Sequence, residues 1–384
     1  MNKYGFSTQA IHSGQEPDSA TGAVITPIYA TSTFAQESPG KHRGYEYSRS
    51  GNPTRAALEA CVAALEEGTA GFAFSSGLAA ESAVIDTLES GAHVVATNDL
   101  YGGTFRLFEK VKKDRNRIAV SYVDMSDPDD IARHIQANTQ MIWVETPTNP
   151  LLKIVDLKKI AALAAKHGLI SVCDNTFASP YLQKPLQFGF DIVVHSATKY
   201  LNGHSDIVAG IVVTNHAALA AQIKFLQNAI GSVLAPFESF LLLRGLKTLS
   251  LRMQAHCNNA RAVAVFLDGH PKVEKVLYPG LAANPYHQLA AAQMRDFGGM
   301  ISVLLKGGAA ETGKFLENTR LFTLAESLGG VESLIEVPAL MTHASIPKEM
   351  REAVGVYDNL VRLSVGIEDA ADLIGDLDRA LEFI

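Results

Sequence analysis

Short apolar runs rich in β-branched residues recur through the middle of this chain, and stretches with helical spacing separate several of them. Residues 157–167, for example, carry apolar side chains three and four positions apart, which places them on one face of a helix. Strands that are apolar on both faces and alternate with helices indicate a parallel sheet covered on both sides. The sequence therefore predicts an α/β fold, with strands expected at 93–97, 118–123, 141–145, 169–173, 191–195 and 207–214.

The same pattern divides the 384 residues into three parts, in line with the length expected for two or three domains. Residues 1–60 are rich in Gly, Pro, Ser and Thr, which is typical of an irregular arm. Residues 61–256 carry the repeated strands and helices of a large domain. A long helical stretch at 247–267 leads into a smaller α/β domain at 257–384, with strands expected near 273–278, 300–305 and 360–365.

Charge and cysteine content exclude several classes of protein. A net charge of −7 argues against nucleic acid or an anionic membrane surface as the main partner, because either would favour a basic face. The 3 cysteines are far apart and form no CxxC pair, so neither a disulfide framework nor a zinc site is expected. The first residues lack an apolar signal core and the apolar runs are too short to span a bilayer, so we expect a cytoplasmic protein.

Polar residues follow several of the predicted strands at the point where each strand ends. In sheets of this kind, ligands bind beyond the carboxyl ends of the strands. We therefore expect one site at this edge of the sheet, built from Tyr101, Asn149, Asp174, Ser196, Thr198 and Lys199.

These side chains meet the needs of a pyridoxal 5′-phosphate (PLP) site. Such a site needs a lysine that forms a Schiff base, a carboxylate for the pyridine nitrogen, hydroxyls and helix-start amides for the phosphate, and an aromatic ring for stacking. The candidates are Lys199 for the Schiff base, Asp174 for the pyridine nitrogen and Tyr101 for stacking. For the phosphate they are Ser196 and Thr198, together with the Gly77 and Leu78 amides of SSGLAA. Each has an ordinary structural explanation when taken alone, so their joint occurrence carries the prediction.

Other sequence patterns correspond to different classes of protein. Residues 308–314 have the GxxxxGK spacing of a P-loop, but Phe315 stands where the Mg²⁺-binding hydroxyl is needed, and a helix start is expected instead. No two glycines are separated by a single residue, so the dinucleotide fingerprint is missing. His195 and His204 flank Lys199 without further ligands at zinc spacing, and no metal site is expected. A cofactor-free binding protein on the same fold is a further alternative.

The stretch DIVVHSATKYLNGHSDIVAG at 191–210 resembles the lysine signature of the cystathionine γ-lyase/cystathionine γ-synthase family, the Cys/Met metabolism enzymes. The similarity covers almost the whole chain in the family's order, through YEYSRSGNPT, SSGLAA, YGGT, ETPTNP, CDNTFASPY, LFTLAESLGGVESL, MTHAS and RLSVGIED. It implies the fold of type I PLP-dependent transferases, similar to aspartate aminotransferase. That fold has a large, mostly parallel seven-stranded domain and a smaller C-terminal α/β domain.

The resemblance also implies a role for each matching residue near the cofactor. Lys199 is expected to hold PLP covalently and to move protons, and Asp174 is expected to partner the pyridine nitrogen. Tyr101 is expected to stack on the ring and to help deprotonate the incoming amine, with Asn149 near the ring's 3-hydroxyl. The phosphate is expected to bind Gly77, Leu78, Ser196 and Thr198, together with Tyr47 and Arg49 of a neighbouring subunit.

For the substrate, the resemblance implies a sulfur-containing amino acid whose α-carboxylate binds Arg362 beside Ser327, with Asn149 nearby. It also implies a homotetramer built from two active dimers. The expected reaction is γ-elimination of L-cystathionine to L-cysteine, 2-oxobutanoate and ammonia, with hydrogen sulfide release as a side activity. The alternative is γ-replacement on an O-acylated homoserine, and the run at 336–345 favours the lyase. The residues expected to separate the two in the distal pocket are Glu46, Arg106, Glu326 and Thr342.

Overall fold

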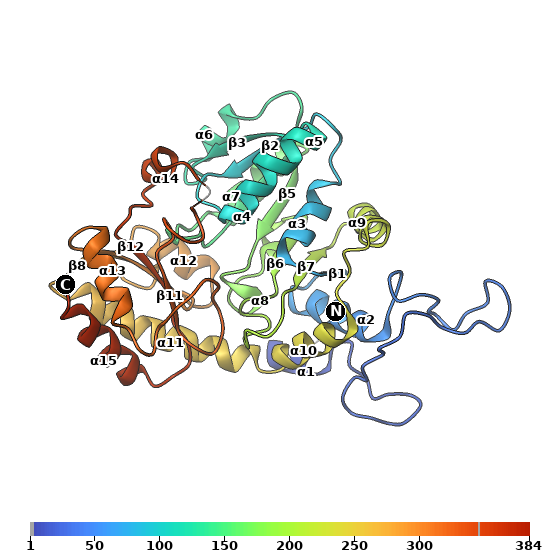
Figure 1. Ribbon diagram of the computed structural model, residues 1–384. Helices are drawn as coiled ribbons and strands as arrows, with labels where there is room; N and C mark the ends of the chain where they lie inside the picture. The colour runs from blue at the N-terminus through green and yellow to red at the C-terminus, as the bar shows by residue number, and fades with distance from the viewer. Residues whose placement is uncertain (1–3, 345) are drawn as a thin grey trace.

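The computed structural model describes residues 4–344 and 346–384, and over these ranges the chain forms two sheets covered by helices (Figure 1). In the 7-stranded sheet, β7 runs antiparallel to both of its neighbours and the remaining pairs are parallel. The strand order is β1 (Ala70–Phe74), β7 (Gly210–Thr214), β6 (Ile192–Ser196), β5 (Ile170–Asp174), β4 (Thr139–Glu145), β2 (His93–Thr97) and β3 (Ala119–Val123). The predicted α/β class and mostly parallel large sheet are confirmed.

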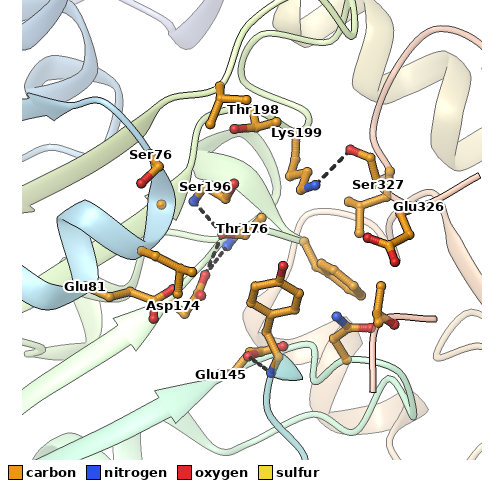
Figure 2. A pocket seen from close by; sticks show the side chains of 18 of the residues that line it. Ser76, Glu81, Glu145, Asp174, Thr176, Ser196, Thr198, Lys199, Glu326 and Ser327 are labelled. Atoms are coloured by element: carbon orange, nitrogen blue, oxygen red, sulfur yellow. Dashed lines mark hydrogen bonds between the residues drawn. The ribbon is translucent and has the colours of Figure 1, made fainter. Parts of the chain in front are cut away.

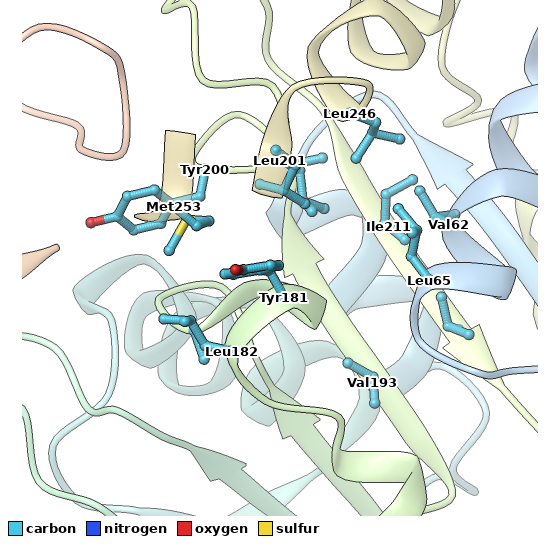
Figure 3. Close-up of a cluster of buried hydrophobic side chains, with 14 of the residues drawn as sticks. Val62, Leu65, Tyr181, Leu182, Val193, Tyr200, Leu201, Ile211, Leu246 and Met253 are labelled. Atoms are coloured by element: carbon cyan, nitrogen blue, oxygen red, sulfur yellow. The ribbon is translucent and has the colours of Figure 1, made fainter. Parts of the chain in front are cut away.

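Helices cover both faces of this sheet because the strands are apolar on both faces. On one face, residues such as Val194 and Val212 pack under α3 (Gly77–Ile85) and α9 (Ala217–Ile230). On the other face, Val193 and Ile211 belong to a buried cluster with residues of α2 (Pro53–Leu65) and α10 (Pro236–Leu246), and Figure 3 shows Ile211 beside Val62 and Leu65 of α2. The shorter elements between the strands are α4 (Gly102–Arg106), a π-helix (Leu107–Lys112), α5 (Lys113–Asn116), α6 (Pro128–Arg133), α8 (Ser179–Leu182) and a 3₁₀ helix (Pro185–Phe188).

Local capping explains why α7 (Leu157–His167) begins and ends where the sequence predicts. The side chain of Asp156 accepts a hydrogen bond from the backbone N–H of Lys159 at 3.1 Å, which satisfies one free amide of the first turn. Gly168 follows the last turn with φ +64°, a conformation that glycine adopts without a steric penalty. The apolar face between these caps, which includes Ile160 and Ala164, is buried against the sheet.

The second domain contains a 5-stranded sheet in which three of the neighbouring pairs are antiparallel. Its order is β10 (Thr323–Leu324), β11 (Leu334–Glu336), β12 (Leu360–Ser364), β9 (Met300–Leu305) and β8 (Val273–Leu277). The three strands expected here are confirmed as β8, β9 and β12. The helices of this part are α11 (Leu249–Asp268), α12 (His287–Gln293), α13 (Ala309–Glu317), α14 (Lys348–Val354) and α15 (Ala370–Leu381).

The expected part boundaries at residues 60 and 257 both fall inside helices. Residue 60 lies within α2, a helix that begins at Pro53 and packs on the large sheet. Residue 257 lies within α11, which runs along both domains (Figure 1). Between residue 4 and α2 the structure has one short helix, α1 (Phe6–His12), and then an irregular segment that extends away from the body as long loops (Figure 1).

The P-loop interpretation of residues 308–314 is wrong, as the sequence argument expected. Gly308 is the N-cap of α13, and its backbone N–H donates to the Glu311 carboxylate at 2.9 Å. The residues that would have to wrap a phosphate therefore form the first turns of a helix. Within the described ranges, no helix is both long enough and apolar enough to cross a membrane.

Candidate functional site

A cavity of about 360 Å³ lies at the carboxyl ends of β4, β5 and β6, where the sequence predicts a site. Side chains of the large domain line one side, and Glu326 and Ser327 face them across the cavity (Figure 2). Leu328, Thr342 and Arg362 of the second domain also line it. The predicted residues that line it are Gly77, Leu78, Tyr101, Asn149, Asp174, Ser196, Thr198, Lys199, Glu326, Ser327, Thr342 and Arg362.

Asp174 ends β5 and presents its carboxylate to the cavity floor. The backbone N–H and the hydroxyl of Thr176 donate to Asp174 Oδ1 at 3.0 and 2.6 Å, which fixes the carboxylate (Figure 2). Burial nevertheless raises the pKa of Asp174. Burial first, and then the charge of Asp174, also raises the pKa of Glu81 and of Glu145 well above the usual range. A floor of buried acids favours a cationic group above it.

The first turn of α3 supplies amides at one end of the cavity. The Ser76 hydroxyl oxygen caps the helix by accepting from the Ala79 N–H at 3.0 Å. The other first-turn amides, including those of Gly77 and Leu78, have no partner within the helix and are suited to bind an anion. A side chain at Gly77 would crowd Ser196, because its Cβ would lie 3.0 Å from the Cβ of Ser196.

Two hydroxyl residues stand beside this turn. The backbone N–H of Ser196 donates to the Thr176 hydroxyl at 2.8 Å, so the strand end and the Asp174 loop are joined. The Thr198 hydroxyl accepts from the Ala209 N–H at 3.0 Å and donates to the Ala209 carbonyl at 3.3 Å. The backbone of Ser196 and the side chain of Thr198 are thus held in place beside the helix start.

Lys199 reaches the cavity from the loop after β6. Its Nζ donates to the Ser327 hydroxyl at 2.8 Å (Figure 2). Burial, and then the nearby charge of Arg362, lowers the pKa of Lys199 to about 8. A much larger fraction of this amine than of an ordinary lysine is therefore neutral near neutral pH, and the neutral form can act as nucleophile or base.

Arg362 is fully buried in β12 and has three partners. Its Nη1 donates to Asn149 Oδ1 at 2.9 Å and lies 3.0 Å from Glu336 Oε1, and its Nη2 donates to the Ser327 carbonyl at 2.9 Å. Among the described residues, its Nε has no hydrogen-bond partner. The edge formed by Nε and the second N–H of Nη2 is therefore available for a carboxylate, in the two-pronged geometry that guanidinium groups favour.

Tyr101 precedes α4 and lines the cavity with its ring. Its backbone N–H donates to the Glu145 carboxylate at 2.8 Å. Burial, followed by the charge of Glu81, raises the pKa of the Tyr101 phenol. In the protein without a bound ligand, the Tyr101 hydroxyl therefore stays protonated at neutral pH.

Four predicted residues do not line the cavity of their own chain. Arg106 and Glu46 are exposed and lie outside it. Tyr47 and Arg49 belong to the irregular arm, where the guanidinium lies 5.5 Å from the tyrosine ring centre and donates to the Asn228 carbonyl at 2.7 Å. Their assignment to a neighbouring subunit's site stays a prediction. The last residue of the 336–345 run, Ser345, lies outside the described residues.

Several residues that shape the site were not predicted from the sequence, and three of them have clear structural roles. Thr176 fixes Asp174, Glu81 lies in the floor, and Glu336 pairs with Arg362. Glu81 could have been found, because it lies four residues after Gly77 and so shares that face of the helix. No local pattern marks Glu336, since its partner lies 26 positions along the chain on an adjacent antiparallel strand.

The cavity fits PLP. Its volume lies within the usual range for ligand pockets of this kind, about 300–1,000 Å³. The lysine, the buried acid beneath it and the close-fitting glycine at a helix start supply an amine for the aldehyde, a carboxylate for the ring nitrogen and amides for the phosphate. A seven-stranded α/β domain with this set of groups around one cavity is the arrangement of a PLP-dependent enzyme.

The comparisons give the family within that class. The model described as "Cys/Met metabolism PLP-dependent enzyme" matches residues 7–382, and this chain belongs to that family of PLP-dependent trans-sulfuration enzymes. A cystathionine β-lyase of Coxiella burnetii is 58% identical over 99% of this chain and 98% of its own length. A cystathionine γ-synthase of Mycobacterium bovis is 55% identical over 98% and 97% of the two chains. The crystal structure of cystathionine γ-lyase from Lactobacillus plantarum with L-serine has a TM-score of 0.96 and 52% identity, with 99% of each chain covered.

Proposed function

We propose that this enzyme cleaves L-cystathionine by γ-elimination and yields L-cysteine, 2-oxobutanoate and ammonia. The position of Lys199 and its lowered pKa are the observations that carry the proposal. Lys199 is the single amine among the described residues of the cavity lining, its pKa is lowered to about 8, and it stands beside Arg362 and Ser327. γ-Elimination needs one base that removes a proton from Cα and then another from Cβ, and a lysine with a long, mobile chain suits both steps.

When bound, PLP supplies an aldehyde that condenses with an amine and a cationic ring that accepts the electron pair released at Cα. We assign Lys199 as the residue that holds it covalently and Asp174 as the partner of the ring nitrogen. Asn149 is assigned to the 3-hydroxyl side of the ring and Tyr101 to its face. The phosphate is assigned to Gly77, Leu78, Ser196 and Thr198, completed by Tyr47 and Arg49 of a second subunit.

The substrate's α-carboxylate is assigned to the Nε–Nη2 edge of Arg362. Glu336 and Asn149 are partners of Nη1 and the Ser327 carbonyl is a partner of Nη2, so among the described residues this edge keeps free donors on a side chain that lines the cavity. The Lys199 amine would take the Cα proton and would later move a proton from Cβ before the Cγ–S bond breaks. Glu326 and Thr342, which line the cavity, are assigned to the distal half of the substrate.

The relatives' names divide between three reactions, so the experiment must separate them. Holoenzyme is supplied with L-cystathionine alone, and both product pairs are quantified. γ-Elimination gives cysteine and 2-oxobutanoate, whereas β-elimination breaks the other C–S bond and gives homocysteine and pyruvate. A second reaction contains O-succinylhomoserine with cysteine, the substrates of the γ-synthase alternative, and Lys199→Ala serves as the inactive control. Predominance of cysteine with 2-oxobutanoate supports the proposal; predominance of pyruvate, or faster turnover in the second reaction, overturns it.

We also propose a cytoplasmic homotetramer of two active dimers. The segment before α2 supports the dimer, since its loops extend away from the body (Figure 1) and its exposed Tyr47 and Arg49 lie outside the cavity of their own chain. Light scattering of the purified holoenzyme tests the assembly, and a monomer at micromolar concentration would contradict it.

A further inference from the structure

A buried carboxylate and imidazole pair lies outside the cavity and has no part in the reaction as described. His195 Nε2 lies 2.6 Å from Glu66 Oε1, and each side chain is 1% exposed. Glu66 follows the last turn of α2, and His195 belongs to β6 directly before Ser196. Neither residue lines the cavity.

The pair contacts the site's strands from the opposite face of the sheet. Successive side chains of a strand point to opposite faces, so His195 points away from the face that carries Ser196. Asn175, the residue after Asp174, donates from Nδ2 to the same Glu66 Oε1 at 3.0 Å. One oxygen atom therefore joins the neighbour of Asp174 to the neighbour of Ser196.

This link lies where the backbone pairing of the two strands ends. The β5–β6 ladder pairs Asp174 with Val194 as its last register position. Beyond it, the Asn175 N–H donates to the Val194 carbonyl at 3.0 Å, and the Ser196 N–H donates to the Thr176 hydroxyl at 2.8 Å. The strand ends that carry the site are thus fastened by Thr176 on the cavity face and by Glu66 on the far face.

The surrounding contacts leave Asn175 a single orientation. Its Nδ2 also donates to the Gln183 carbonyl at 2.8 Å, and its Oδ1 accepts from Gln183 Nε2 at 3.0 Å. A carboxylate is costly to bury, and apolar residues of similar size often stabilise such a position equally well or better. Among the described residues, Glu66 Oε2 and His195 Nδ1 have no hydrogen-bond partner, so the position is not optimised for stability.

We propose that Glu66 and His195 are positioning residues, which hold Asp174 and Ser196 in register so that they face the ring nitrogen and the phosphate of PLP. The inference rests on the roles given to Asp174 and Ser196 under the proposed function.

The test compares His195→Leu, which removes the ring nitrogens, with His195→Gln, whose side-chain amide restores a donor. Three quantities are measured: the dissociation constant of PLP from the apoenzyme, the ¹⁵N chemical shift of ring-labelled PLP in the holoenzyme, and kcat and KM for cystathionine. For His195→Leu we expect the dissociation constant to rise about tenfold or more, as for loss of one hydrogen bond to a charged group. The ¹⁵N signal should move toward the unprotonated position and kcat should fall, whereas KM stays within about twofold because Arg362 is untouched. His195→Gln should recover much of each change.

A His195→Leu protein with a lower melting temperature but a wild-type ¹⁵N shift and PLP affinity would overturn the inference, because a purely structural pair predicts that pattern. If His195→Leu does not fold, Glu66→Met removes the acceptor from the other side and should change the same three quantities; wild-type values in that variant also overturn it. A wild-type protein that binds no PLP, or that binds it with an unprotonated ring nitrogen, would instead contradict the proposed function.

Discussion

Replacing Arg362 by leucine should destabilise the fold and weaken substrate binding for two separable reasons. The guanidinium is fully buried and lies 3.0 Å from Glu336 Oε1, which is 1% exposed at the side chain. Removing one partner of a buried pair leaves an uncompensated charge and typically costs about 3–5 kcal/mol. Removing both partners, in Arg362→Leu with Glu336→Leu, eliminates that charge, so the double variant should recover most of the lost stability.

The substrate effect should not recover in the double variant. A carboxylate on the free edge of Arg362 gains two charge-assisted hydrogen bonds, each contributing about 1.5–3 kcal/mol. Loss of about 3 kcal/mol corresponds to a fall of more than about 100-fold in kcat/KM. Both variants should show this fall and should keep the visible absorbance of bound PLP.

The stability loss in the single variant should also depend on pH. Burial raises the pKa of Glu336, and the positive charge of Arg362 lowers it. In the Arg362→Leu variant this lowering charge is absent. The folded single variant therefore binds a proton that the unfolded chain releases, and its stability falls as pH rises above the unfolded pKa of about 4.3. Denaturant unfolding at pH 5.5 and pH 8 measures this difference. Equal stability of wild type and single variant, or recovered kcat/KM in the double variant, would refute the reasoning.

Three further predictions concern the cofactor residues. Asp174→Asn keeps the volume but removes the carboxylate, so kcat should fall by at least about 100-fold while far-UV circular dichroism stays unchanged; unaltered kcat would exclude the role assigned to Asp174. Burial lowers the pKa of Lys199 to about 8, so the rate of PLP attachment to the apoenzyme should rise with pH and level off above about pH 8. A rise that begins only near pH 10 would contradict the assignment. Mixing inactive Lys199→Ala subunits with Arg49→Ala subunits should restore part of the activity, and no recovery after demonstrated subunit exchange would argue against shared sites.

The periodic parts of the fold could be predicted from the sequence because their signal is local. The strands at 93–97 and 300–305 and the helix at 157–167 have the expected bounds, since each carries a regular pattern of apolar residues between clear ends. The strand at 70–74 was missed because AGFAF has a glycine and no β-branched residue, and the 2- and 3-residue strands β10 and β11 are too short to form a pattern.

The grouping of the site residues could also be predicted, because parallel strands bring their carboxyl ends to one edge. The side-chain contacts that position the site residues could not be predicted from the sequence. Glu336 beside Arg362 and Glu66 beside His195 depend on how separate segments pack, and the latter pair is 129 positions apart in the chain. The left-handed backbone of Ser327, with φ +90°, likewise follows from the loop's tertiary contacts and not from its residue type.

The covalent bond between PLP and the amine of Lys199 is the central claim, and borohydride reduction tests it most directly. Reduction of the holoenzyme, followed by digestion and peptide mass spectrometry, should find the pyridoxyl phosphate mass on Lys199, with loss of the visible absorbance. Lys199→Ala should carry no such label. A label on a different lysine, or a wild-type protein that stays colourless and unlabelled after incubation with PLP, would contradict the account.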